Sequence, residues 1–226
     1  MCGRLAIFAG YTEYSAQLPF PIKYDLADFK PNYNAAPTQM LPVLYRPDEE
    51  EPLLQTLKWG LIPHWAKDQT IGYKLFNARA ETAHEKPSFR DAFVKRRALI
   101  PVNGWYEWFR QGGEKQPYWH TRNDEGMIWL GGLWESWTDK ASGESVRSFT
   151  ILTQEAYGDI ARIHNRMPVV IGADDYAPWL SHDVSDKSEV RDLIKAQAEI
   201  ELEIYPVSKA MNKAQLNDVS CIQRID

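Results

Sequence analysis

Cys2 directly follows the initiator methionine of this 226-residue chain, and that position gives it the chain's most unusual potential chemistry. A small second residue favours removal of Met1, which leaves a cysteine with a free α-amine. An α-amine has a pKa of about 7.7–8.0 and a lysine about 10.4, so far more of the terminal amine is neutral at pH 7. The thiol, with an ordinary pKa near 8.5, is a second nucleophile on the same residue.

A terminal 1,2-aminothiol of this kind can react in two ways. It can condense with an aldehyde to an imine, on which the sulfur closes a thiazolidine ring. It can instead attack an amide through sulfur, with the amine as base. The structural alternative is that Cys2 is a start-codon accident or a small buried hydrophobic residue.

Glu107 is a carboxylate within the aromatic run Gly104–Trp108. Desolvation raises the pKa of a carboxylate and makes it a useful proton donor and acceptor near pH 7. In a strand, alternation places Trp105 and Glu107 on one face and Tyr106 and Trp108 on the other. A pocket carboxylate is therefore one interpretation, and an outward-facing glutamate on a strand with buried aromatics is the other.

His164 lies between two arginines, Arg162 and Arg166, just before Pro168. Arginine is a natural phosphate ligand, and a histidine beside it is a natural acid or base. A single histidine is otherwise more typical of a surface or of a satisfied core position. The arginines on both sides favour a site for a phosphate-bearing substrate.

Asn77, Arg79 and Glu81 occupy alternate positions in one predicted loop. The functional interpretation uses Asn77 to orient an amine or hydroxyl and Arg79 to bind phosphate, whereas turn chemistry with a surface ion pair is the alternative. The aromatic and proline-rich loop 59–65 ends in Trp65, which could pack in the core or stack on bases.

The composition indicates an ordinary soluble protein, with 44% hydrophobic and 25% charged residues. A net charge of −5 argues against a broad basic face but leaves room for a local basic groove. The two cysteines, Cys2 and Cys221, make no disulfide framework, which fits a reducing compartment.

The sequence contains no signal peptide or stretch of transmembrane length, so we expect a cytoplasmic protein, nucleoid-associated when it acts on DNA. We find no phosphate-binding glycine motif and no metal-ligand spacing, so we expect no cofactor and no metal. A monomer is the expected state.

Short strands at hairpin spacing dominate the predicted elements, and regular alternation of strand and helix is absent. This pattern predicts an α+β fold, one domain over residues 1–226, around a mostly antiparallel, partly closed barrel-like sheet. The expected strands are 5–8, 40–46, 53–59, 98–102, 105–109, 117–121, 127–134, 146–153, 169–171, 203–207 and 219–225. Helices are expected near 11–18, 88–97, 155–163, 174–180 and 188–198, and residues 31–37 are expected to be irregular.

Seven short motifs, taken in order along almost the whole chain, resemble one family. The chain is identified as similar to the SRAP family of SOS-response-associated peptidases, also called abasic-site-processing proteins. Each motif is weak alone, but seven in order with Cys at position 2 are highly specific. The motifs are Met1–Arg4, Tyr33–Pro37, Trp59–Pro63, Asn77–Thr82, Gly104–Trp108, His164–Pro168 and Pro206–Ser208.

This resemblance implies a single-stranded DNA groove around Cys2 and a thiazolidine crosslink to abasic sites. It also implies DNA lyase activity at those sites and autoproteolytic removal of Met1. By matched position, Cys2 is the nucleophile, Asn77 orients the amine and sugar, Glu107 transfers protons and His164 lies at the opened sugar. The implied DNA contacts are Arg4, Arg79, Arg166, Thr153, Asn34, Trp65 and Ser208.

Two other functions fit parts of the pattern. Glutamine amidotransferases also begin Met-Cys-Gly, so an N-terminal-nucleophile amidohydrolase is one alternative, although their downstream loops are missing here. A non-catalytic reader of single-stranded or modified DNA, with Cys2 silent, is the other. The mass of the intact protein after incubation with abasic DNA, undamaged DNA or glutamine distinguishes the three.

Overall fold

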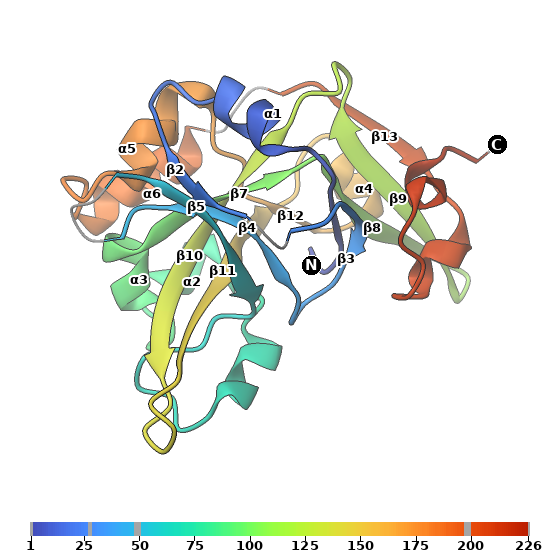
Figure 1. The fold of residues 1–226 in the computed structure, drawn as a ribbon. Coiled ribbons are helices and arrows are strands. Elements are labelled where there is room, and N and C mark those ends of the chain that lie inside the picture. Colours follow the sequence, from blue (N-terminus) through green and yellow to red (C-terminus); the bar gives the residue numbers. More distant parts are fainter. Residues whose placement is uncertain (1, 27–28, 48–50, 197–199, 226) are drawn as a thin grey trace.

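The computed structural model describes residues 2–26, 29–47, 51–196 and 200–225. Five of its strands close into a barrel (Figure 1), because each pairs with the next and the last pairs with the first. Four of these pairings are antiparallel, and the closing pairing between β11 and β5 is parallel. The barrel strands are β4 (Met40–Tyr45), β5 (Leu53–Trp59), β7 (Arg97–Val102), β10 (Ile128–Thr138) and β11 (Ser145–Glu155).

A second, antiparallel sheet lies to the right of the barrel in Figure 1. Its strands, in spatial order, are β13 (Leu202–Pro206), β9 (Glu114–Arg122), β8 (Gly104–Gln111), β1 (Leu5–Ile7) and β3 (Asn32–Ala35). Three short strands extend the barrel sheet: β2 (Lys23–Asp25), β6 (Asn77–Arg79) and β12 (Arg166–Pro168).

The helices are short and lie around the sheets. The most regular is α6 (Lys187–Lys195), where Asp186 accepts a hydrogen bond from the Ser188 amide and Val190 and Ile194 are buried. The other α-helices are α1 (Tyr11–Ala16), α2 (Ala80–Ala83), α3 (Arg90–Lys95), α4 (Ile160–Ile163) and α5 (Tyr176–Leu180). Single 3₁₀ turns are η1 (Gln69–Lys74), η2 (Ala173–Asp175), η3 (Lys209–Asn212) and η4 (Val219–Ile222).

Strands β8 and β9 approach unusually closely at Gly104. A Cβ at that position would lie 2.2 Å from the carbonyl oxygen of His120 and 2.6 Å from the Trp119 ring. Only glycine fits there. The two faces of the hairpin pack into two different hydrophobic cores. Trp105 packs into the main core, whereas Tyr106 and Trp119 pack beneath the C-terminal segment. This confirms the predicted alternation along the strand.

The predicted fold class, α+β with a mostly antiparallel, partly closed barrel, is confirmed. Several predicted elements are wrong. Residues 219–225 form no strand, because Asp218 caps a 3₁₀ turn by accepting from the Ser220 amide. The helix predicted at 155–163 is only α4, since β11 continues to Glu155. The strand predicted at 169–171 is instead β12, at Arg166–Pro168. Residues 32–35, predicted to be irregular, form strand β3.

The helix predicted at 188–198 falls partly outside the described residues, at 197–198. None of the helices in the described part of the chain combines the length and apolarity that crossing a bilayer requires.

Candidate functional site

Strand β8 places Glu107 close to Cys2, at the start of the chain. The residue is only 1% exposed, which is unusual for a glutamate. Burial raises the pKa of Glu107 to about 7. The side chain is therefore poised between its acid and carboxylate forms near neutral pH, as a proton-transfer group should be.

Strand β1 brings the amino-terminal segment alongside Glu107. Leu5 pairs with Trp105, and the Tyr106 amide donates to the Arg4 carbonyl at 3.0 Å. Cys2, just before β1, is completely buried. Burial raises the pKa of the Cys2 thiol well above its usual range, and the Glu107 carboxylate raises it further.

Asn77 reaches the same place from the other sheet. Its strand, β6, pairs in parallel with β11, with Asn77 opposite Ile151. The Asn77 Nδ2 donates a hydrogen bond of 2.7 Å to the carbonyl of Cys2, and its Oδ1 is buried without a hydrogen-bond partner. The amide therefore holds Cys2 with its donor and keeps one acceptor available for a donor at the reaction centre.

His164 completes the group from the end of α4. Its Nε2 lies 4.0 Å from Glu107 Oε2. His164 Nδ1 lies 3.0 Å from the Arg166 amide nitrogen and 3.2 Å from the Arg166 carbonyl oxygen, so it accepts from the amide or donates to the carbonyl according to the ring's tautomer. Burial lowers the pKa of His164, and the nearby positive charges of Arg110 and Arg166 lower it further.

Arg166 is anchored beside this group rather than free in solvent. Its guanidinium makes two hydrogen bonds to Glu81, at 2.7 and 2.9 Å, and one of 2.6 Å to the Thr153 carbonyl. Bonding to Arg166 lowers the pKa of Glu81. Thr153 is 1% exposed and its hydroxyl faces the Ala78 carbonyl.

Among the predicted DNA contacts, Arg79 and Trp65 have solvent-exposed side chains. Arg79 is exposed at the end of β6, two residues after Asn77. The Trp65 indole is 50% exposed, and its N–H points to the Pro87 carbonyl at 3.4 Å. Both are placed to meet a ligand that approaches from solvent.

Arg4, Asn34 and Ser208 belong to a different group, beneath the C-terminal segment. Asn34 is 1% exposed and its amide donates to the carbonyls of Met211, Lys213 and Leu216. Arg4 donates to Asn34 Oδ1 and the Met211 carbonyl. Ser208 accepts from the Ala210 amide at the start of η3. Their side chains bind protein atoms here, and a role for them in DNA binding stays a prediction.

Three residues near the site were missed by reasoning from sequence. Glu81 was considered only as part of a surface ion pair, and Arg110 was not singled out although its charge reaches His164. His120 was also missed, although it lies in the predicted strand 117–121 of the same hairpin; the structure pairs it with Trp105, two positions from Glu107. Among the residues described, no group of three His, Cys, Asp or Glu side chains could hold a metal ion.

Comparisons with known proteins indicate one family for this chain. A family model described as SOS response associated peptidase (SRAP) matches residues 1–214. The chain is 34% identical to the abasic site processing protein YoqW of Bacillus subtilis (strain 168), over 99% of each chain. It is 27% identical to the abasic site processing protein HMCES of Gallus gallus, covering 100% of this chain and 78% of that protein.

A solved structure supports the same conclusion. A crystal structure of a protein from Bacteroides thetaiotaomicron superposes with a TM-score of 0.87 and 26% identity, covering 99% of this chain and 100% of the other. A small α+β protein with a closed barrel, and with a buried Cys and Glu beside a partly buried Asn and His, is thus the class defined by fold and site. The chain belongs to the SRAP family, whose curated relatives are named abasic site processing proteins.

Proposed function

We propose that this protein binds single-stranded DNA and forms a covalent crosslink to abasic sites through Cys2, after removal of Met1. The observation that carries the proposal is the convergence of Cys2, Asn77, Glu107 and His164 from four separate segments. The names of the relatives support a DNA substrate with a missing base.

The first step is imine formation. An abasic site is in part an open-chain aldehyde, and the neutral Cys2 amine adds to its C1′. Glu107 accepts the proton lost by the amine and returns it to the departing hydroxyl, which leaves as water. A carboxyl with a pKa of about 7 can do both in turn. His164, whose Nε2 lies 4.0 Å from Glu107 Oε2, assists opening of the sugar.

Ring closure follows at sulfur. The thiol adds to the imine carbon, its proton passes to the nitrogen, and a thiazolidine results. Burial keeps the Cys2 thiol protonated in the unprocessed chain. If the sulfur does not close, loss of the C2′ proton to a base expels the 3′ phosphate, which is the lyase reaction.

The mass of the intact protein tests the proposal directly. After incubation with abasic single-stranded DNA, we expect wild type to lose Met1 and gain the mass of the DNA less one water. Cys2→Ala should form an imine that borohydride traps but no stable adduct. A hydrolysis-resistant adduct formed equally well by Cys2→Ala would disprove the thiazolidine. A gain of mass with glutamine instead of DNA would support an amidohydrolase.

A further inference from the structure

His120 is a buried imidazole that the proposed chemistry does not use. It lies on β9 and is completely inaccessible to solvent. The antiparallel register of the hairpin pairs it with Trp105, and the next pair on the same face joins Glu107 to Tyr118. Its ring stacks on the Trp105 indole with 5.0 Å between centroids and 13° between planes. His120 is therefore the diagonal neighbour of Glu107 on the same face of the hairpin.

The side-chain nitrogens of His120 and Trp105 lack hydrogen-bond partners in the protein. Neither ring nitrogen of His120 makes a hydrogen bond, and the Trp105 indole N–H makes none either. The carbonyls of Trp105 and Tyr118 favour a protonated ring electrostatically but do not meet the geometry of a hydrogen bond. A position that only filled space would suit an aliphatic side chain, because unpaired buried polar groups are unfavourable.

The imidazole is neutral at physiological pH. Burial lowers the pKa of His120 to about 4, with a smaller contribution from His164 in the same direction. A neutral ring has one donor and one acceptor nitrogen. Strand β13 places the apolar Ile204 opposite His120. The titratable and charged groups on this face of the sheet are Glu107 on β8, Tyr118 and Arg122 on β9, and His164 after α4.

We propose that His120 is a positioning residue for Glu107, acting through a bridging water that hydrogen-bonds both the imidazole and the carboxylate. Diagonal neighbours across an antiparallel pair have backbone positions about 7–8 Å apart, and long side chains narrow that separation to one that a water can bridge. The Trp105 indole N–H, buried without a partner in the ring stacked on His120, is a second donor for that water. The inference rests on the proposed role of Glu107 in proton transfer.

The titration of Glu107 in DNA-free protein tests this inference without any crosslinking reaction. The signal of the Glu107 carboxyl carbon, assigned by its loss in Glu107→Gln, is followed by ¹³C NMR across pH. His120→Phe keeps a stacked ring but removes both nitrogens, so the pKa of Glu107 should rise by about half a unit or more. His120→Gln restores a hydrogen-bonding group and should return it towards the wild-type value.

A matched control separates positioning from packing. Tyr106→Phe removes a buried polar atom from the opposite face of the same sheet, where the hydroxyl donates to the Tyr33 carbonyl. This variant should leave the Glu107 titration unchanged. The melting temperature of His120→Phe should equal or exceed that of wild type, because the phenyl ring has no polar atoms to satisfy.

Crosslinking kinetics supply the second measurement. We expect His120→Phe to crosslink abasic single-stranded DNA about tenfold more slowly, within the range of acid–base effects, and to have no further effect in a Glu107→Gln background. An unchanged Glu107 titration in His120→Phe overturns the inference, as does an equal loss of rate in both backgrounds. If wild type forms no adduct, the proposed function fails, but the NMR titration still decides the role of His120.

Discussion

At the scale of single residues, Glu107 carries the most demanding assignment, since it must both accept and donate a proton. Glu107→Gln keeps the shape and the hydrogen-bonding capacity but cannot exchange protons. General acid–base assistance is worth about 10²–10⁴-fold, so we expect single-turnover crosslinking to slow by that order. Affinity for undamaged single-stranded DNA should be close to wild type.

The comparison of rate with affinity decides this assignment. A loss of rate below about threefold, or one matched by an equal loss of affinity, would remove Glu107 from proton transfer. The lyase reaction provides a control within the same experiment, because C2′ deprotonation also needs a base and should slow in parallel.

Glu107 also links stability to pH, and the sign follows from its raised pKa. The folded protein releases this proton at a pKa of about 7, whereas an unfolded glutamate releases it near about 4.3. Between these values the folded state binds more protons, so the free energy of unfolding falls as pH rises. Glu107→Gln removes this loss, which corresponds to about 3 kcal/mol when complete. In thermal unfolding, the stability of Glu107→Gln relative to wild type should increase between about pH 4.5 and 7.5. A difference in stability that stays constant with pH would contradict a raised pKa for Glu107.

At the scale of secondary-structure elements, the sequence predicted best the strands that pair locally. The hairpin carrying Glu107 could be predicted, with its two faces, because apolar and polar residues alternate across a glycine-containing loop. The strand predicted at 219–225 failed because an Asp and a Ser made a 3₁₀ cap, a local hydrogen bond that outweighs β propensity.

The contact between Asn77 and Cys2 shows what could not be predicted from the residues alone. It joins positions 75 apart and depends on the parallel pairing of β6 with β11, which no hairpin spacing indicates. The resemblance between motifs grouped these two residues correctly, but the hydrogen bond between them came from the structure. Likewise, nothing in the sequence around Arg166 predicted that its guanidinium hydrogen-bonds to Glu81.

The ion pair between α2 and β12 gives a prediction at this scale. The Glu81 carboxylate is bound to the Arg166 guanidinium. Under the proposed function, a DNA phosphate would bind the same guanidinium, so the carboxylate and the phosphate would compete for it. Glu81→Gln should therefore tighten binding of undamaged single-stranded DNA by about threefold to tenfold at low salt, the scale of ~1 kcal/mol. Fluorescence anisotropy measures this affinity. Weaker binding would show instead that Glu81 orients Arg166 for DNA.

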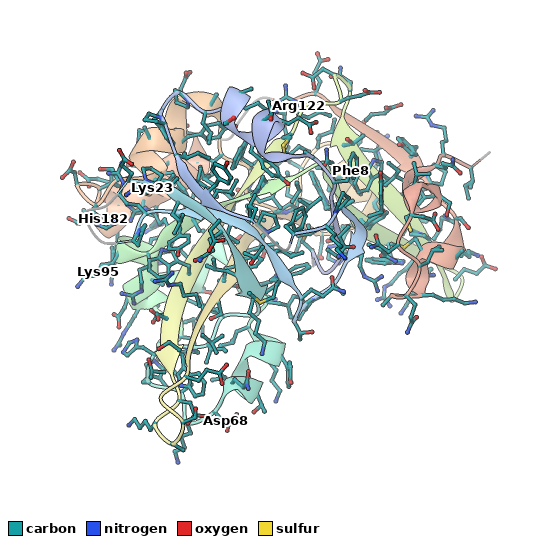
Figure 2. All side chains as sticks on the ribbon, viewed as in Figure 1. Phe8, Lys23, Asp68, Lys95, Arg122 and His182 are labelled. Carbon is teal, nitrogen blue, oxygen red and sulfur yellow. The ribbon has the colours of Figure 1, made fainter. Side chains whose placement is uncertain are left out.

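At the scale of the whole molecule, the charge distribution limits how DNA can bind. The net charge is −5, and several cations lie away from the site. Lys23 and Lys95 lie on the left in Figure 2, whereas the N-terminus lies right of the centre in the same view (Figure 1). Under the proposed function, we expect affinity to come from a few arginines, namely Arg79, two residues after Asn77, and Arg110 and Arg166, whose charges reach His164, and from stacking on aromatic residues such as Trp65.

This distribution predicts a shallow dependence of DNA affinity on salt. Each phosphate neutralised on a single strand contributes about 0.7 to the slope of log affinity against log salt, so three arginines give a slope of about −2. Arg79→Ala should reduce its magnitude by about 0.7, and Arg166→Ala by less, because Glu81 already offsets that charge. Lys95→Ala, a cation on the far side, should leave the slope unchanged. A slope steeper than about −4, or one that responds to Lys95 and not to Arg79, would place the DNA on another face.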